Sequence, residues 1–502
     1  DHIPQILKRT SQRGRSFDEA EKEDPRWCCW ALMLEHSVPE VAAFVEYMHR
    51  KSPKLSRAEY ADKGRPILEI MRQPIFIVAF IAAAIGYAGT LIFFTISVAI
   101  GLTIATGAMV SRALGAGDRE EAARRGGAAM LIMGVVMGVI STVAWLLIPQ
   151  LLGLIGAEGE TKQLADGFLR IVFPSIAIMA VGMCTTGILR GVGDARRSMY
   201  VTLAGGAAAA VLDPLFIFGF DLGLQGAAIS TVLSRIVLLA VGLHGAIVVH
   251  RLVRLPDLAA LAAAMRPFFA IGGPAVLTQL ATPVGNAYVT AQIAGFGDSA
   301  VAGWAIIGRI LPVAFAVIFA LSGAVGPILG QNYGAKLYPR LTETMRDALI
   351  FTTLYVLVVW GLLALFSGQV AGLFGAQGEA RDLVIFFCTF ASASFLFNGA
   401  LFVSNAAFNN LGFAFHASAL NWGRSTLGVI PFVWFGAQHY GATGVIAGWA
   451  LGAVVFGVAG AFLCFRVIAT IEQRDRSDHD RLPGPPPTAH SPFSTGKAAT
   501  LG

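Results

Sequence analysis

The stretch VLDPLFIFG, residues 211–219, places a carboxylate where simple packing cannot explain it. Asp213 lies inside a long apolar region and is followed at once by Pro214. A charged side chain in the hydrocarbon of a bilayer costs about 2–4 kcal/mol unless it faces a cavity or a partner. Proline removes a backbone donor and bends a helix, which opens the backbone to such a cavity. The pair predicts an ion or proton site within a membrane, although an aspartate that caps a helix near the membrane surface would give the same pattern.

A second motif is the GxGD pattern Gly191-Val-Gly-Asp194, which intramembrane aspartyl proteases also contain. Such an enzyme needs two carboxylates close enough to share a proton. Asp194 is instead followed by Arg196 and Arg197 in a polar connection. No P-loop, zinc-protease or nucleophile-elbow motif occurs elsewhere, and the five cysteines have no metal spacing and no disulfide pattern. We therefore expect no enzyme activity, no metal and no cofactor.

The composition places these residues in a membrane. Of the 502 residues, 55% are hydrophobic and only 14% are charged, with a mean hydropathy of +0.66. A soluble protein with so little charge could not cover its surface with polar groups, so most of this surface must face lipid. The net charge of +6 comes from basic residues in loops between apolar runs, so it requires no nucleic-acid partner.

Eleven apolar segments are long enough to cross a bilayer as helices, which takes roughly 20 residues each. They lie at about 81–109, 127–152, 167–189, 198–219, 224–248, 268–295, 300–328, 347–372, 382–408, 417–437 and 441–465. The connections alternate between short neutral or acidic ones and basic ones, the latter including those at 112–125, 190–197, 251–266, 336–346 and Arg424. By the positive-inside rule the basic connections and the C-terminus are cytoplasmic. The sequence predicts an all-α polytopic protein of the inner (plasma) membrane.

An internal repeat divides the apolar part into two halves. Matches with one common offset of 219 residues include Gly107 with Gly326, Gly193 with Gly412, and GLIGAEGE (153–160) with GLFGAQGE (372–379). The basic connections also correspond, so the halves are parallel repeats, an arrangement typical of alternating-access transporters. The helix at 268–295 corresponds to residues 49–76, which are too polar to span a bilayer. We therefore expect two parallel-repeat six-helix lobes of which the first has only five helices.

This pattern predicts five parts of the chain. They are a polar N-terminal segment that is not native to the fold (1–73), a first transmembrane lobe (74–248), an inter-lobe linker (249–267), a second transmembrane lobe (268–466) and a disordered cytoplasmic tail (467–502). The tail contains a stretch rich in proline and glycine at 483–487, a composition that favours disorder.

Several motifs taken together resemble the multidrug and toxic compound extrusion (MATE) family. They are MVSRALGAGDREEAARR (109–125), ILRGVGDARRSMY (188–200), VLDPLFIFG (211–219) and LGLQGAAIST (222–231). The resemblance covers most of residues 80–465. It implies twelve helices in two six-helix lobes, a central cavity, and export of organic cations driven by entry of protons or sodium. We expect a monomer in the lipid bilayer.

The resemblance also assigns a cation-coupling site. Asp213 matches the acidic residue of the family's fifth helix, and Thr231 matches its hydroxyl partner in the sixth. Ala209 stands where the family usually has asparagine, and the acidic residue of the first helix has no counterpart here. Hard cations prefer several oxygen ligands. We therefore expect proton coupling, with sodium as the alternative.

Polar residues of the second half are candidates for the substrate cavity, namely Gln279, Asn286, Asn398, Asn405 and Arg309. The four amides are on helices that border the cavity in the resembled family, although interhelical hydrogen bonding is their commoner role. Arg309, like Arg235, could instead extend to the membrane surface or bond the carbonyls at a helix end.

Two other functions stay open. A lipid-linked oligosaccharide flippase of the same superfamily would need basic residues in the first-lobe cavity, where only Arg235 and, near a span edge, Arg170 occur. A truncated, inactive relative is the other alternative, because the first helix is missing from the predicted plan.

Overall fold

The computed structural model describes residues 74–481. The predicted N-terminal segment 1–73 and residues 482–502 therefore lie outside the described residues. The chain divides into two compact units, Asp1–Ala83 and Ala84–Gly502, and the lobes described below belong to the second, except for the first ten residues of α7. The described residues form helices and turns without strands, as expected for a chain whose backbone groups must be satisfied inside lipid. The predicted all-α membrane fold is confirmed.

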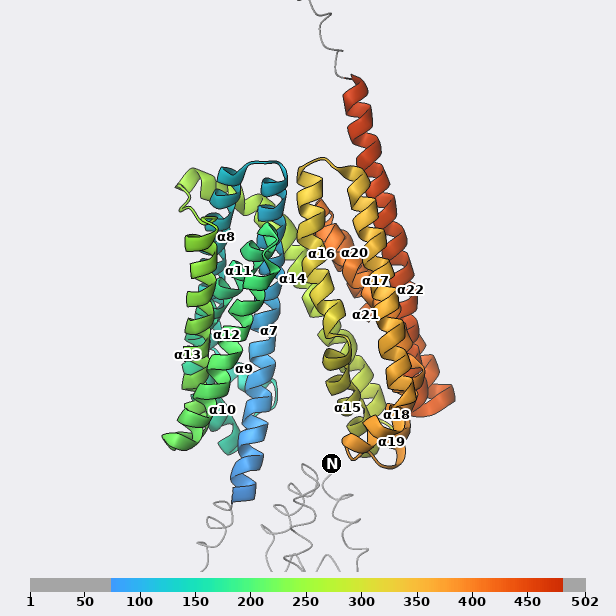
Figure 1. Cartoon of the computed structure of the whole chain (residues 1–502). Helices are drawn as coiled ribbons and strands as arrows, with labels where there is room; N and C mark the ends of the chain where they lie inside the picture. The colour runs from blue at the N-terminus through green and yellow to red at the C-terminus, as the bar shows by residue number, and fades with distance from the viewer. Residues whose placement is uncertain (1–73, 482–502) are drawn as a thin grey trace, which may run out of the picture. The chain divides into compact units, whose positions relative to one another are not determined.

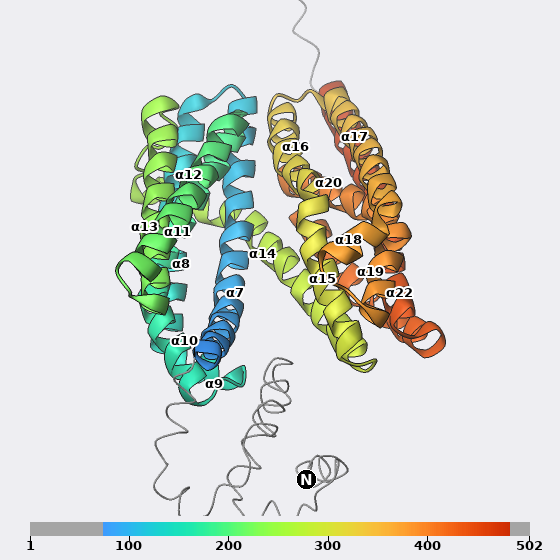
Figure 2. The same ribbon diagram turned by 60° about the horizontal axis from the view of Figure 1, so that its bottom comes forward.

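The first lobe consists of α7 to α13, which lie on one side in Figures 1 and 2. Its helices are α7 (Pro74–Gly115), α8 (Arg119–Leu146), α9 (Ile148–Leu154), α10 (Gly159–Val172), α11 (Ile176–Val192), α12 (Ala195–Pro214) and α13 (Gly223–Leu243). A 3-10 turn, η2 (Phe173–Ser175), joins α10 to α11. Two π-helical turns, η3 (Leu215–Gly219) and η4 (His244–Val249), extend α12 and α13.

The second lobe lies on the other side, and α14 (Leu258–Ala294) passes between the lobes (Figure 1). The lobe contains α15 (Asp298–Ala314), α16 (Ala316–Gly334), α17 (Tyr338–Leu365), α18 (Ser367–Leu373), α19 (Gly378–Thr389), the 3-10 turn η5 (Ala391–Ser394), α20 (Phe395–Leu411), α21 (Ala414–Ser425) and α22 (Ile430–Arg481).

The structure repeats with the offset found in the sequence. Helices α8 and α17 begin and end 219 residues apart, and so do α11 and α20. Gly193 and Gly412, which end α11 and α20, both have φ of 94°. Left-handed backbone of this kind favours glycine because it has no Cβ, and it ends a helix by turning the chain away. The matched glycines therefore fix the same helix ends in both lobes.

Nine described helices are long and apolar enough to span a membrane, or ten if the bent pair α15 and α16 counts as one span. The last of them, Ala414–Asp475, is interrupted by Gly441, whose φ of 64° and ψ of −147° separate two helices. These two helices run antiparallel, because Gly436 contacts Gly444 and Gly448 contacts Phe432 through the backbone. When α15 and α16 count as one span and the two sides of Gly441 count separately, the described residues contain eleven segments that could cross a membrane, the number that hydropathy predicts.

Helix α14 belongs to both lobes. Phe268 and Ile271 are buried in the apolar cluster of the first lobe, together with residues of α7, α8 and α11. Farther along, the carbonyl of Leu277 accepts a 3.0 Å hydrogen bond from the indole of Trp422 on α21. The contacts of α14 thus change from the first lobe to the second within about two turns, around Pro274.

The predicted linker and tail are both shorter than the sequence suggested. Asp257 caps α14 by accepting a hydrogen bond from the backbone N–H of Ala260 (2.7 Å), so helix begins inside the predicted linker 249–267. The residues that follow, LAALAAAMR, are strong helix formers.

Helix α22 likewise continues to Arg481, where a disordered tail from residue 467 was predicted. Asp475 holds this extension by accepting a hydrogen bond from the Tyr338 hydroxyl (3.2 Å).

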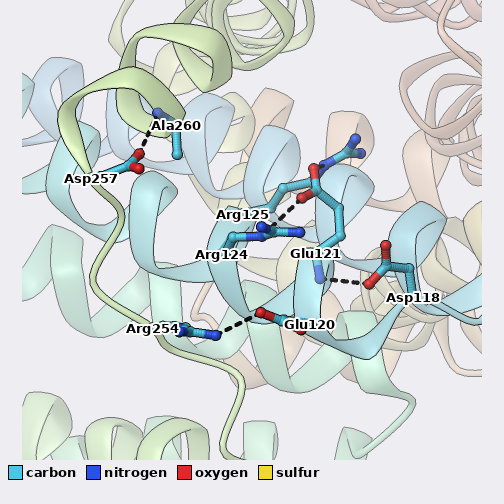
Figure 3. Close-up of polar contacts among 8 residues, drawn as sticks. All are labelled: Asp118, Glu120, Glu121, Arg124, Arg125, Arg254, Asp257 and Ala260. Carbon is cyan, nitrogen blue, oxygen red and sulfur yellow. Dashed lines mark hydrogen bonds and ion pairs between the residues drawn. The ribbon is translucent and has the colours of Figure 1, made fainter.

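The non-helical linker lies along α8 (Figure 3). Arg254 pairs with Glu120 at 2.6 Å, and its backbone N–H donates to the carbonyl of Ala123 at 3.0 Å. Gly126 and Gly127 of α8 allow the linker backbone to approach so closely that a Cβ at either position would overlap with it. The linker is therefore fixed to the first lobe.

Asp194 of the GxGD motif caps α12. Its side chain accepts hydrogen bonds from the backbone N–H of Arg197 at 2.9 Å and from the Arg197 guanidinium at 2.6 Å, and it lies 2.8 Å from His250 Nε2. Partial burial alone would raise its pKa, but these hydrogen bonds together lower the pKa of Asp194 to about 2. The carboxylate therefore stabilises the helix end as an anion.

We expect Asp194→Ala to destabilise the protein by about 1 kcal/mol at neutral pH, because it removes the helix cap. Because the folded-state pKa is depressed, the contribution of Asp194 is complete above an unfolded-state pKa of about 4 and is lost as the pH falls towards 2. Thermal unfolding of the purified protein over this pH range measures the difference. Asp194→Asn, which keeps a capping oxygen, is the control and should be less harmful at neutral pH. A wild-type-minus-Ala difference that grew on acidification would contradict this role.

Candidate functional site

Asp213 is half-buried near the end of α12. Pro214 follows it, and the helix then widens into the π-helical turn η3. Proline cannot donate a backbone hydrogen bond, and π-helical turns are frequent at functional sites. The structure therefore places the predicted carboxylate at an irregular part of its helix.

Helix α13 packs antiparallel to α12 and brings hydroxyl groups to the level of Asp213. Close contacts of Gly226 with Phe216 and of Gly205 with Leu238 set the register, which places Asp213 and Ser230 at the same level along the two helices. The Ser230 hydroxyl is buried and has no hydrogen-bond partner among the described residues. Thr231, the predicted partner, donates a 2.8 Å hydrogen bond to the carbonyl of Ala227. Ser230 was missed from the sequence, although it adjoins Thr231 in the AAIST motif.

Arg235 on α13 has a structural role. Its guanidinium is buried and donates hydrogen bonds to the Val172 carbonyl at 3.1 Å and to the Ser175 hydroxyl at 2.7 Å. Val172 precedes the 3-10 turn η2 and Ser175 is its last residue, where Pro174 interrupts the helix. Arg235 thus satisfies backbone that the break exposes, and it does not extend to the membrane surface.

The predicted cavity residues of α14 lie on one open face. Gln279 is half-buried, and Thr282, Asn286 and Thr290 are exposed. Their spacing of three or four residues gives a single stripe along the helix. A polar stripe of this kind is unfavourable against lipid, so this face of α14 is suited to a water-filled space.

The remaining predicted cavity residues occupy different environments. Arg309 is exposed on α15. Asn398 and Asn405 are buried within α20, and the amide oxygen of Asn405 has no hydrogen-bond partner among the described residues. The structure therefore places Gln279 and Asn286 on one face and encloses the two α20 asparagines in the interior of the second lobe.

Arg424 is buried in the second lobe, whereas the sequence pattern predicted that it lies in a cytoplasmic connection; that prediction was wrong. Only 6% of this residue is exposed, and it lies in the last turn of α21. One guanidinium nitrogen donates to the Thr282 hydroxyl on α14 at 3.1 Å, while Nε is buried and has no acceptor in the part of the chain that the structure describes. The connection that precedes this span is instead the short turn at Gly412, from which α21 begins at Ala414. The position of Arg424 inside the apolar segment 417–437 indicated that its side chain is buried.

The two lobes meet at the helix ends that the basic loops assign to the cytoplasm. Arg112 of α7 donates hydrogen bonds to the carbonyls of Asn410 at 2.6 Å and Asn409 at 3.0 Å, at the end of α20. In the other direction, Gln331 of α16 donates to the carbonyl of Gly191 at 2.8 Å, at the end of α11. Arg112 and Gln331 are 219 residues apart, as are Gly191 and Asn410. The contact therefore has the symmetry of the repeat, with a cation on one side and a neutral amide on the other.

Comparison with known families identifies this arrangement. The MatE family profile matches residues 80–215 and 274–435, which include α12 with Asp213 and α21 with Arg424. The chain belongs to the MatE family. The resemblance seen in the sequence motifs is confirmed. The protein is a multi-pass membrane transporter, and MatE-family members are transporters rather than enzymes.

Individual MatE proteins are similar over most of their length. The FAD transporter of Shewanella oneidensis is 24% identical over 400 residues, which is 78% of this chain and 88% of the relative. The multidrug export protein MepA of Staphylococcus aureus is 25% identical over 355 residues, covering 69% and 77% of the two chains. A solved mutant of the Vibrio cholerae MATE transporter VcmN superposes with a TM-score of 0.75 at 27% identity, covering 80% of this chain and 94% of that one.

Proposed function

We propose that this MatE transporter exports amphipathic organic cations across the plasma membrane in exchange for protons, with Asp213 as the coupling residue. The observation that carries the proposal is the position of Asp213. It is the only acidic residue in the α12 span, it is half-buried, and it adjoins the Pro214 bend and the η3 turn. An anion in such a place attracts both a proton and a cationic substrate, and competition between the two couples their movements.

The surroundings of Asp213 favour a proton over sodium. A hard cation is held by several oxygen ligands at once. On the facing helix, the hydroxyls of Ser230 at this level and Ser234 one turn away have no hydrogen-bond partner among the described residues, whereas the Thr231 hydroxyl is already bonded to the Ala227 carbonyl. A proton needs only the carboxylate. The similarity to a bacterial multidrug export protein supports export of drug-like compounds.

We expect Asp213→Asn to abolish export driven by a pH gradient while leaving the protein folded, because the amide cannot release a proton. The measurement is export of a cationic dye by proteoliposomes under an imposed pH gradient or an imposed sodium gradient. Asp221→Asn is the matched control, because Asp221 is exposed and has a positive φ of 55° that asparagine tolerates. Export by Asp213→Asn at the wild-type rate would exclude the coupling role of Asp213. Export by the wild-type protein under a sodium gradient alone would identify sodium, rather than the proton, as the coupling ion.

A further inference from the structure

Two apolar stretches of the second lobe carry positive charge without a matching carboxylate. Residues 268–334 and 395–465 include Arg309 and Arg424, and their one acidic residue is Asp298 at the first position of α15. A buried arginine in a membrane is costly and normally pairs with a counter-charge or with backbone carbonyls. Arg424 has neither among the described residues, because its guanidinium forms a hydrogen bond only to the Thr282 hydroxyl there.

Arg424 and its neighbour Ser425 face the same part of α14. The guanidinium donates to Thr282, and the side chain of Ser425 packs on Gly285, where an added Cβ would lie 3.1 Å from the Ser425 Cβ. Arg424 Nε and Ser425 Oγ are both buried, and neither has a hydrogen-bond partner within residues 74–481. A pair of unused polar groups, one of them cationic, is the chemistry of a site that binds a carboxylate or a phosphate.

Both helices are irregular at this level. Helix α21 ends at Ser425, and helical structure resumes only at Ile430. On the opposite side, Pro283 of α14 has no N–H to donate, which frees the carbonyl of Gln279. Broken helices within a membrane are tolerated where they are enclosed by protein or line a cavity, and transporters bind substrates at such breaks. Thr282 is exposed on the polar stripe of α14, so the guanidinium reaches the edge of the open face.

A purely structural role would have Arg424 stabilise the end of its own helix. Basic residues near a helix C-terminus do so by bonding the last carbonyls. The Arg424 guanidinium instead donates a hydrogen bond to the Thr282 hydroxyl on another helix. Arg235 in the first lobe shows the structural alternative, since it bonds both a carbonyl and a hydroxyl at a helix break.

We propose that Arg424, with Thr282 and Ser425, binds an anionic group of the exported compound, a carboxylate or a phosphate. Arg309 on the exposed face of α15 adds positive charge to the same lobe. This inference rests on the proposed export function and narrows its substrate class to amphiphiles that carry an anionic group beside their cationic one. The cationic end is attracted by Asp213 of the first lobe, and the anionic end is held by Arg424 of the second.

Rhodamine B and its ethyl ester are suitable probes, because they share one cationic ring system and differ only in a free carboxylate. Fluorescence anisotropy with the purified full chain measures their binding. We expect wild type to bind rhodamine B at least about tenfold more tightly than the ester, as a charge-assisted hydrogen bond would provide. Arg424→Gln should remove this preference by weakening rhodamine B binding alone, and Arg424→Lys should restore part of it.

Arg466→Gln is the matched control, because Arg466 is exposed on α22 of the same lobe, and it should keep the full preference. Melting temperature and size-exclusion profile show that each variant is folded. Equal wild-type affinity for both dyes, absence of rhodamine B binding, or equal weakening of both dyes by Arg424→Gln would overturn the proposal. Asp213→Asn should keep the preference while losing coupled export, so a failure of the coupling proposal is distinguishable from a failure of this one.

Discussion

Gly452→Val is expected to prevent the second lobe from folding. Gly452 on α22 lies against the backbone of Gly428, and a Cβ added there would overlap with the Gly428 carbonyl. The same hairpin has further backbone contacts at Gly436, Gly444 and Gly448, so the two helices cannot separate at one point alone. Overpacking costs about 1–3 kcal/mol where side chains can move aside. Here the obstacle is backbone, so we expect a larger cost.

The measurement is the yield of monodisperse protein after extraction and its melting temperature. Gly361→Val is the control, because Gly361 lies on α17 of the same lobe and an added Cβ would meet nothing within 4 Å. We expect the control to be extracted and to melt like wild type. A Gly452→Val protein with a wild-type melting temperature would show that the hairpin is not packed as described.

Arg112→Ala is expected to open the cytoplasmic contact between the lobes. The change removes two charged hydrogen bonds to the end of α20 and a cation–π contact of 5.7 Å with Tyr333. Hydrogen bonds to charged groups contribute about 1.5–3 kcal/mol each. A total near 3 kcal/mol would change the ratio of closed to open states by about a hundredfold. Export should slow, because the transporter would rest in the state open to the cytoplasm.

Double electron–electron resonance measures this opening as the distance between spin labels attached at positions 116 and 335. Both residues are exposed, and they occupy equivalent places in the two repeats. Gln331→Ala is the internal comparison, because it removes the symmetry-related but uncharged hydrogen bond. We expect a smaller shift in distance for it than for Arg112→Ala. Unchanged distances in both variants would mean that apolar packing alone keeps the lobes closed.

The helix plan was predictable because the signals are local. Glycine at positions 193 and 412 marks a left-handed helix end that few other residues adopt, and the shared offset places both ends without any tertiary information. The helix irregularity next to Asp213 was predictable for a similar reason, since a proline within an apolar run disrupts a helix.

The environment of Arg424 and the contact between the lobes could not be predicted from local sequence signals. Hydropathy does not show where a helix breaks, and the break after Ser425 contains no proline. At the lobe contact, Arg112 bonds the backbone carbonyls of Asn409 and Asn410. Carbonyl acceptors belong to every residue type, so the sequence alone could not indicate the partner.

Helix α14 was predicted to belong to the second lobe alone, because a sequence pattern cannot show that one helix packs in two lobes.

The division of α14 between the lobes has a consequence for biogenesis. Chains are synthesised from the N-terminus, and domains generally fold in that order. The first-lobe cluster includes Phe268 and Ile271, so the lobe lacks part of its interior until α14 has left the ribosome and entered the membrane. The second half of the same helix then presents Leu277 and Thr282 to α21, which is synthesised more than a hundred residues later. Helix α14 would thus complete the first lobe and provide the first surface on which the second lobe assembles.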